Sequence, residues 1–309
     1  MATVADFMRE WDAPDEYVTA HTSGSTGTPK TIRLLKSDMR VSARATNTFF
    51  GIGAGSVLGL PLSVDYIAGK MMAVRAHEAG CRLVELPVSN EITVPESIDL
   101  LAVVPSQIPS LLLSGTADRV RHLLVGGAPL SAEAAGALTD CGVDAWLGYG
   151  MTETCSHVAL RRIADDDNLY HAMPGISFSV DGNGCLTIES ERFSWHRLVT
   201  RDVVELQSPQ TFRWLGRADN VINSGGIKIH PESLEAEIRG ALPWLPSFYI
   251  VGEPDARWGS RPVMVAEGPI DIALVKSVLR DRRTAPARVV VVGTLPTTSN
   301  GKLLRRLPE

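Results

Sequence analysis

The chain has 309 residues, of which 44% are hydrophobic and 21% charged, and its net charge is −5. This length predicts two unequal domains, because domains typically hold roughly 100 to 200 residues, and the composition excludes long disorder. The acidic balance excludes the basic excess that nucleic-acid backbones demand. No signal-peptide pattern and no run of ~20 apolar residues is present. We therefore expect a cytoplasmic protein with no nucleic-acid partner and no membrane span.

The four cysteines are scattered and show no Cys-x-x-Cys spacing: Cys81, Cys141, Cys155 and Cys185. This pattern favours reduced thiols over disulfides or a zinc site.

The first two thirds of the chain alternate short apolar runs with helical patterns. Strands are predicted at residues 57–62, 82–86 and 100–104, and helices at 66–79 and in the segment ending at Leu113. This alternation is typical of βαβ units around a mainly parallel sheet. In such sheets ligands bind outside the carboxyl ends of the strands.

After Gly175 the pattern becomes antiparallel, with strands predicted at 176–180 and 186–189 around a turn containing Asn183-Gly184. Two more strands are expected at 203–206 and 211–215. Beyond Asp219 a small α+β module is predicted, with helices at 232–239 and 272–280 and strands at 248–251, 262–266 and 289–292. The fold class predicted is α/β: a large N-terminal domain, residues 1–218, of mainly parallel sheet with an antiparallel portion, and a small mobile α+β domain, residues 219–309.

A stretch rich in glycine and hydroxyl residues precedes a strand predicted at 31–35. Its backbone N–H groups, hydroxyls and one lysine suit a polyphosphate. The stretch is not a Walker A loop, because Gly-Lys-Ser/Thr is missing and no helix follows. From composition alone, a flexible linker is the alternative. The predicted nucleotide-binding residues are Thr22, Ser23, Gly24, Ser25, Thr26, Gly27 and Lys30.

The order Thr-Ser-Gly-Ser-Thr-Gly-Thr-Pro-Lys in this stretch resembles the signature of the adenylate-forming superfamily of acyl-CoA synthetases, luciferases and nonribosomal peptide adenylation domains. Similar segments follow in the family's order at 126–129, 148–153, 200–202, 216–231 and 295–302. The segment at 200–202 departs from the family, because Arg201 stands where glycine is usual. The resemblance implies ATP, Mg²⁺ and coenzyme A as cofactors, and an acyl-AMP formed from a carboxylic acid.

The same resemblance implies roles for single residues around the nucleotide. Tyr149, between Gly148 and Gly150, would stack on adenine, although a plain tight turn is the alternative for this segment. Thr152 would contact the α-phosphate or the substrate carboxylate, and Glu153 would hold Mg²⁺. Four further residues are implied at the pocket and the ribose: Gly126, Gly127 and Ala128 at the adenine and acyl pocket, and Asp202 at both ribose hydroxyls.

The C-terminal part of the resemblance implies a domain that swings between two half-reactions. Arg217 would reach the ribose or α-phosphate, and Asp219 would be the hinge, with a surface salt bridge between them as the alternative. Gly225 and Gly226 would line a tunnel for coenzyme A. Lys302 would be the catalytic lysine near the attacking carboxylate.

Segments 60–70, 104–107 and 151–161 look most like o-succinylbenzoate–CoA ligases of menaquinone synthesis. This resemblance implies a small aromatic dicarboxylic acid as substrate and a pocket with a cation or strong donors. The candidate contacts are Tyr66, Lys70, Gln107, His157 and Arg161. The last two share a face if their stretch is helical, and Lys70, His157 and Arg161 could equally be exposed helix residues.

Three alternatives stay open: a ligase for another aromatic or short-chain acid, a free-standing adenylation domain, and a non-catalytic protein that binds ATP or acyl-AMP. The resemblance covers residues 17–309, whereas the family ordinarily carries a subdomain before the phosphate loop. We expect a face to be exposed as a result, and a homodimer would shield it.

Overall fold

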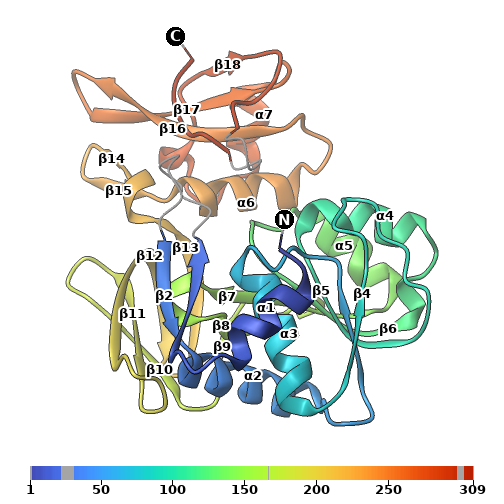
Figure 1. Cartoon of the computed structure of the whole chain (residues 1–309). Helices are drawn as coiled ribbons and strands as arrows, with labels where there is room; N and C mark the ends of the chain where they lie inside the picture. Colours follow the sequence, from blue (N-terminus) through green and yellow to red (C-terminus); the bar gives the residue numbers. More distant parts are fainter. Residues whose placement is uncertain (1, 22–30, 166, 298–302, 309) are drawn as a thin grey trace. The chain divides into compact units, whose positions relative to one another are not determined.

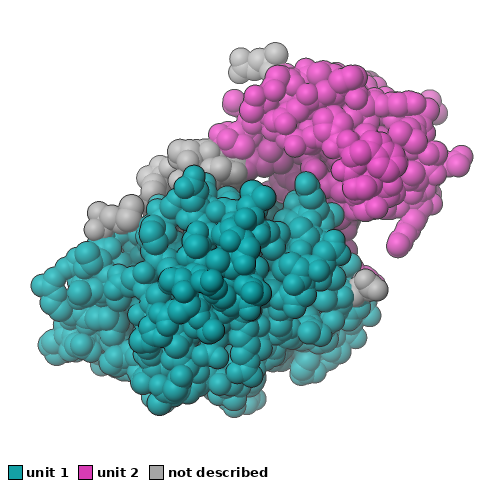
Figure 2. Space-filling model, turned by 90° about the vertical axis from the view of Figure 1, so that its right-hand side faces the viewer, with its two compact units in different colours: residues 1–178, 188–198, 207–212 teal, residues 179–187, 199–206, 213–309 magenta. Residues whose placement is uncertain are grey.

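The computed structural model describes residues 2–21, 31–165, 167–297 and 303–308 (Figure 1). The chain divides into two compact units (Figure 2). Unit 1 holds residues 1–178, 188–198 and 207–212, and unit 2 holds residues 179–187, 199–206 and 213–309. The division into moving domains at 218/219 stays a prediction.

Unit 1 contains a mainly parallel sheet in the order β4-β3-β5-β6-β7-β8-β9. Its strands are β3 (Val57–Leu60), β4 (Arg82–Glu85), β5 (Ile98–Val103), β6 (Val120–Val125), β7 (Asp144–Gly150), β8 (His157–Arg162) and β9 (Tyr170–Ala172). Pairing is parallel from β4 to β7, and β8 and β9 are antiparallel. The first residues of β13 (Thr211–Arg217) pair with β9. This mixed sheet confirms the predicted α/β class.

Apolar residues dominate the inner parallel strands β3, β5 and β6, as expected of strands that are covered on both faces, whereas β4 at the sheet edge is partly exposed. In β5, Leu100 and Leu101 have no exposed surface, and neither has Leu123 in β6. These strands form one core with residues such as Ile108 and Leu138 from the neighbouring helices. The core thereby fixes the carboxyl ends of β5, β6 and β7 at one edge of the sheet.

Five helices in the described part of unit 1 accompany this sheet: α1 (Val4–Asp12), α2 (Lys36–Phe50), α3 (Ile67–Ala79), α4 (Ile108–Leu113) and α5 (Ala132–Cys141). Helices α2 and α3 end at Gly51 and Gly80, whose left-handed φ angles of 66° and 61° need no Cβ. Helix α3 begins very close to the preceding loop. A Cβ at Gly69 would lie 2.2 Å from the carbonyl oxygen of Ser63, so only glycine fits there.

A separate antiparallel hairpin frames the phosphate loop predicted from the sequence. Strand β1 (Tyr17–His21) pairs with β2 (Thr31–Leu35), and His21 is opposite Thr31. Strand β2 therefore confirms the strand predicted at 31–35. Residues 22–30 lie outside the described residues.

Strands β10 (Ile176–Val180), β11 (Cys185–Ser190), β12 (Arg197–Ser208) and β13 are divided between the units. The rest of unit 2 is the predicted α+β module. Hairpin β14 (Ile222–Ser224) and β15 (Ile227–Ile229) joins β17 (Gly259–Ala266), which also pairs with β16 (Phe248–Asp255) and, in parallel, with β18 (Val289–Val291). Helices α6 (Pro231–Ala241) and α7 (Ile272–Val278) cover this sheet with a separate apolar core.

Across the described ranges, no helix has both the length and the apolar character needed to cross a membrane.

Candidate functional site

Two predicted elements fall outside the described residues. These are the phosphate-loop residues Thr22, Ser23, Gly24, Ser25, Thr26, Gly27 and Lys30, and the catalytic candidate Lys302. Their flanks are described: His21 pairs with Thr31, and Thr297 forms an isolated antiparallel bridge with Leu303.

Residues Gly126, Gly127 and Ala128 follow directly after β6, at the ligand-binding edge expected of a parallel sheet. The amide of Gly126 donates to the carbonyl oxygen of Val103 at 3.1 Å, which holds the ends of β5 and β6 together. Gly127 has φ +85°, and a Cβ on it would lie 3.3 Å from Val104. A Cβ on Gly126 would meet nothing within 4 Å, so a flat ligand could approach the backbone of this turn at Gly126.

Residues Gly148, Tyr149 and Gly150 form the end of β7, not the tight turn that the sequence also allowed. Pairing with β8 shifts register between Tyr149 and Gly150, and a Cβ on Gly150 would lie 2.2 Å from the carbonyl oxygen of Ser156. Glycine is required for this irregularity. The ring of Tyr149 packs edge to face against Phe212, with centroids 5.1 Å apart.

Thr152 and Glu153 lie in a 3-10 turn, η3 (Thr152–Thr154), just beyond β7. Thr154 fixes this turn, because its hydroxyl donates to the carbonyl oxygen of Ser156 at 2.7 Å and accepts from the amide of Met151 at 3.0 Å. Thr152 is half-buried and Glu153 is exposed. An exposed carboxylate on a fixed turn suits a hydrated Mg²⁺ ion.

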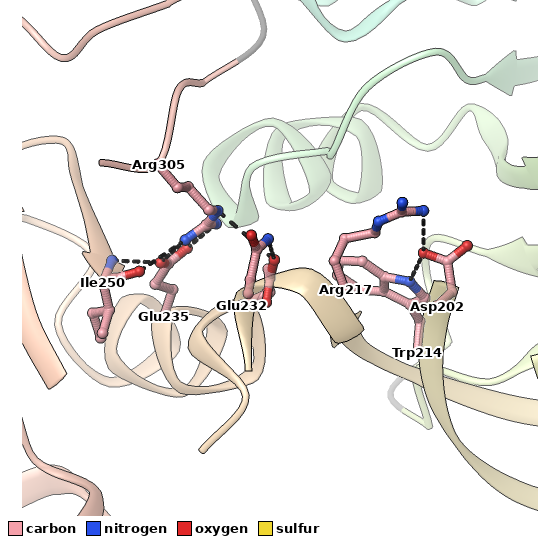
Figure 3. A network of polar contacts seen from close by, with 8 residues as sticks. Asp202, Trp214, Arg217, Glu232, Glu235, Ile250 and Arg305 are labelled. Atoms are coloured by element: carbon pink, nitrogen blue, oxygen red, sulfur yellow. Dashed lines mark hydrogen bonds and ion pairs between the residues drawn. The ribbon is translucent and has the colours of Figure 1, made fainter. Parts of the chain in front are cut away.

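Asp202, Trp214 and Arg217 form a cluster within unit 2 (Figure 3). The Asp202 carboxylate, on β12, is 8% exposed. Its Oδ1 accepts from Trp214 Nε1 at 3.2 Å and from Arg217 Nη1 at 3.4 Å. The carboxylate is thus held in place beside a guanidinium, which suits a ligand that carries both hydroxyl groups and negative charge.

The hinge candidate Asp219 lies in a second 3-10 turn, η4 (Ala218–Asn220), directly after β13. Arg201 Nη1 donates to Asp219 Oδ1 at 2.6 Å, and Arg217 Nη2 lies 3.6 Å from Oδ2. The salt bridge left open for Arg217 and Asp219 is therefore present, and Arg201 adds a second partner to this carboxylate.

Gly225 and Gly226 form the two-residue turn between β14 and β15, with φ values of +57° and +84°. The amide of Gly225 donates to the carbonyl oxygen of Trp258 at 2.9 Å. A Cβ on Gly225 would lie 2.5 Å from the Trp258 indole, whereas a Cβ on Gly226 would meet nothing within 4 Å.

Two of the five candidates for the acid pocket are engaged elsewhere. Lys70 Nζ lies 4.4 Å from the ring centroid of Phe7 and 3.7 Å from Glu10, both on α1. Burial lowers the pKa of Lys70. The buried Gln107 amide donates to the carbonyl oxygens of Pro61 and Ser89 at 3.2 and 2.8 Å, and its Oε1 accepts from a backbone amide. These side chains stabilise the surrounding fold.

The other three candidates differ in exposure. Tyr66 precedes α3 and is 50% exposed. His157 and Arg161 lie on strand β8, so the helix on which they were expected to share a face is not formed. Arg161 contacts Asn168 and lies over the Tyr170 ring, with 5.7 Å to its centroid.

His157 is buried beside α2. Its Nε2 lies 3.1 Å from the hydroxyl of Thr46, and its Nδ1 lies 3.3 Å from the hydroxyl of Ser156. Burial, and then the charge of Arg75, lowers the pKa of His157 well below 6.5, so the ring is neutral near pH 7. It contributes a hydrogen-bonding group and no charge.

Arg75, on α3, is a buried cation that the sequence analysis missed. It is 1% exposed. Its Nη2 donates to Ser156 Oγ at 2.6 Å and its Nη1 lies 3.4 Å from the Met72 sulfur. No carboxylate in the described part of the chain pairs with it, its Nε has no hydrogen-bond partner there, and burial lowers its pKa to about 9. A single arginine within the apolar run 71–76 was the available signal.

Comparisons with known proteins agree with this geometry. The AMP-binding enzyme family matches residues 5–183. A 2-succinylbenzoate–CoA ligase of Enterococcus faecalis is 24% identical, over 97% of this chain and 70% of its own length.

Among solved structures, an acyl-CoA synthetase (AMP-forming)/AMP-acid ligase II-like protein from Dyadobacter fermentans is 33% identical, with a TM-score of 0.67, over 97% of this chain and 91% of its own. The o-succinylbenzoate coenzyme A synthetase from Bacillus subtilis in complex with ATP and magnesium ion shares the fold, with 21% identity, a TM-score of 0.76 and coverage of 93% and 68%. The chain therefore belongs to the AMP-binding enzyme family, which confirms the resemblance found in its sequence.

Proposed function

We propose that the chain is an o-succinylbenzoate–CoA ligase of menaquinone biosynthesis. It converts 2-succinylbenzoate, ATP and coenzyme A into 2-succinylbenzoyl-CoA, AMP and pyrophosphate. The reaction class follows from the family: the chain is an AMP-forming acid–thiol ligase that uses ATP with Mg²⁺ and coenzyme A. The choice of acid rests on the buried guanidinium of Arg75, and on the curated relative that is named for this activity.

The observation that carries the choice of acid is the buried Arg75 guanidinium. A buried charge is strongly disfavoured unless it is paired, and no carboxylate of the described residues pairs with Arg75. A dicarboxylic acid would complete the site, because one carboxylate reacts while the other pairs with the guanidinium. Ser156 and the neutral His157 would supply further hydrogen bonds to that second carboxylate.

Several described residues could contact the ribose, the phosphates and the adenine of ATP. The held carboxylate of Asp202 would accept hydrogen bonds from the ribose hydroxyls, and Arg217 would contact the ribose or the α-phosphate. At the sheet edge, a Cβ on Gly126 would meet nothing within 4 Å, so its backbone would be accessible to adenine, on which Tyr149 would stack. Glu153 would hold Mg²⁺, which neutralises charge on the departing pyrophosphate.

The reaction proceeds in two nucleophilic displacement steps. A substrate carboxylate oxygen attacks the α-phosphorus of ATP, the bond to pyrophosphate breaks, and the acyl-AMP forms. The sulfur of coenzyme A, after losing its proton, then attacks the acyl carbon, and AMP leaves with the electron pair. Lys302 would stabilise the charge that builds when two anions approach in the first step, and rotation at Asp219 would expose the acyl-AMP to the thiol.

The test is pyrophosphate release with a panel of acids, combined with variants of Arg75. We expect release with 2-succinylbenzoate and little with benzoate. The variant Arg75→Met should raise KM for 2-succinylbenzoate roughly 10- to 100-fold, as expected for a lost charged hydrogen bond, with partial recovery in Arg75→Lys. Arg44→Met is the matched control, because Arg44 is exposed and pairs with Glu78. Equal use of benzoate, with no effect of Arg75→Met, would rule out this acid.

Other results of the same panel identify the alternatives. Release with a different aromatic or short-chain acid would indicate a ligase for that acid, and adenylate formation without transfer to coenzyme A would indicate an adenylation domain. No release with any acid would indicate a nucleotide-binding protein without catalysis. The cytoplasmic location and the homodimer stay predictions.

A further inference from the structure

The described C-terminal segment, residues 303–308, is attached to unit 2 through Arg305 (Figure 3). Arg305 Nη2 donates to Glu235 Oε2 at 2.7 Å and Nη1 donates to Glu235 Oε1, so the pair is bidentate. Arg305 Nη1 also lies 3.3 Å from the carbonyl oxygen of Ile250 on β16. One side chain therefore joins the C-terminal segment to both α6 and the sheet.

The acidic partner of Arg305 is held independently. Glu235 is 7% exposed, and its Oε1 accepts from the amide of Ile250 at 2.6 Å. Burial raises the pKa of Glu235, while the Arg305 guanidinium opposes this shift. A buried carboxylate fixed by a backbone amide sets the position of any cation that pairs with it.

A second carboxylate on the same face of α6 connects Arg305 to the hinge segment. Glu232 Oε1 lies 3.7 Å from Arg305 Nε and accepts a hydrogen bond from Asn220 Nδ2. Asn220 belongs to η4 and follows Asp219 directly. A cavity of about 490 Å³ is lined by both Arg305 and residues 219–223. Glu232 therefore provides a polar connection between Arg305 and η4.

Backbone contacts fix the same C-terminal segment on both sides of Arg305. The amide of Leu304 donates to the carbonyl oxygen of Pro296 at 2.8 Å, Leu303 pairs with Thr297, and the Tyr249 hydroxyl donates to the carbonyl oxygen of Arg306. Lys302 immediately precedes this segment in the sequence.

We infer that Arg305 is a positioning residue for adenylate formation: it fixes the chain next to Lys302 and, through Glu232 and Asn220, connects that chain to the segment containing Asp219. This inference rests on the proposed function, because it assigns the first half-reaction to Lys302. Arg305 itself does not touch the substrates. Its loss lowers the rate of the step that needs the lysine and leaves the second step nearly intact.

The test measures the two half-reactions separately in Arg305→Met. We expect kcat for pyrophosphate release to fall about 10- to 100-fold, the range that a misplacement near 1 Å produces. KM for the acid and the rate of thioester formation from supplied acyl-AMP should change less than about threefold. Arg305→Lys should recover part of the rate. Arg306→Met is the matched control, since the adjacent Arg306 side chain is exposed.

Two additions separate positioning from a folding defect. The double variant Arg305→Met/Glu235→Leu removes both buried charges, so it should fold without recovering adenylation. Amide hydrogen exchange supplies a readout without catalysis. In Arg305→Met we expect faster exchange at Leu304, whose amide donates to Pro296, and also at Val221, whose amide donates to Ala218 in η4 at 3.4 Å.

The experiments on Arg305 can be interpreted independently of the test that identifies the acid substrate. If another acid proves to be the substrate, the half-reactions are measured with that acid, and the expected ratio is unchanged. If no acid reacts, the exchange at Val221 decides the connection to η4. The inference is overturned if both half-reactions fall equally, if adenylation is unaffected, or if exchange at Val221 matches that of the unsubstituted protein.

Discussion

Arg201 Nη1 lies 2.6 Å from Asp219 Oδ1 and connects β12 to the turn that follows β13. Arginine occupies a position where glycine is usual in the resemblance seen in the sequence. The glycine-to-arginine departure therefore supplies an additional ion pair to the residue proposed as the hinge. Both side chains are well exposed, at 70% and 48%.

The variant Arg201→Gly should leave stability almost unchanged, because an exposed pair contributes roughly 0.2–1 kcal/mol. Thioester formation should become up to about fivefold faster at low salt, since rotation at Asp219 no longer breaks the pair. Single-turnover rates at low and high salt measure this effect, which should disappear as salt screens the pair. Arg213→Gln is the control, because Arg213 forms a comparable exposed pair with Glu205 on the same strands. An equal effect in the control would contradict the prediction.

His157 should make stability depend on pH. Its folded-state pKa is well below 6.5, so the unfolded chain binds this proton more readily. The associated stability is complete above pH 6.5 and is lost as pH falls toward the folded pKa, by about 2 kcal/mol between pH 7 and 5. Urea unfolding across this range should show a shallower dependence in His157→Gln. The exposed His171 gives the control His171→Gln, and identical pH profiles for both variants would refute the assignment.

The two turn glycines should respond differently to alanine. Gly226→Ala introduces only an unfavourable φ and should destabilise unit 2 by about 1 kcal/mol. Gly225→Ala adds a Cβ 2.5 Å from Trp258 and should cost roughly 2–4 kcal/mol. Urea midpoints with unchanged m-values measure the difference. The free energy of unfolding of the double variant Trp258→Ala/Gly225→Ala should approach that of Gly226→Ala. A double variant as unstable as Gly225→Ala would exclude the clash.

The cysteines should differ in reactivity. Burial, aided by the charge of Asp38, raises the pKa of Cys155 to about 12, whereas Cys141 is exposed. Because the thiolate is the reactive form, iodoacetamide at pH 8 should modify Cys141 and leave Cys155 intact until the chain is unfolded. Mass spectrometry of peptides locates the label, with Cys141→Ser as the control. Labelling of native Cys155 at the rate of Cys141 would contradict this expectation.

Elements with long apolar runs could be predicted from the sequence. Strands β3, β4 and β5 match the predicted runs, because each is bounded by polar or turn residues. Strands β3 and β5 are mostly buried, whereas β4 is exposed at both of its ends. Hairpin β14–β15 could not be predicted, since each strand has only three residues and shows no clear alternation. Gly225-Gly226 is compatible with a two-residue hairpin turn, but the flanking segments are too short to indicate strands.

The sequence points to candidate site residues where a local motif suggests a role, and these roles stay predictions. It gives little sign of a residue such as Arg75, whose importance depends on burial. The stretch from His157 to Arg161 contains three consecutive apolar residues, which fit a strand as well as a helix, and Cys155 at φ +62° ends the turn before it. Arg75 lies in a helix whose residues 69–76 are all buried, so no polar face marked where the guanidinium points. Only the packing of α2, α3 and β8 reveals it.

The close packing of Gly69 against Ser63 limits where helix α3, and with it Arg75, can lie. A methyl group at position 69 would push the first turn of α3 away from the loop beneath it, and Arg75 belongs to the same helix. The position of the buried guanidinium therefore depends on the absence of a side chain at Gly69.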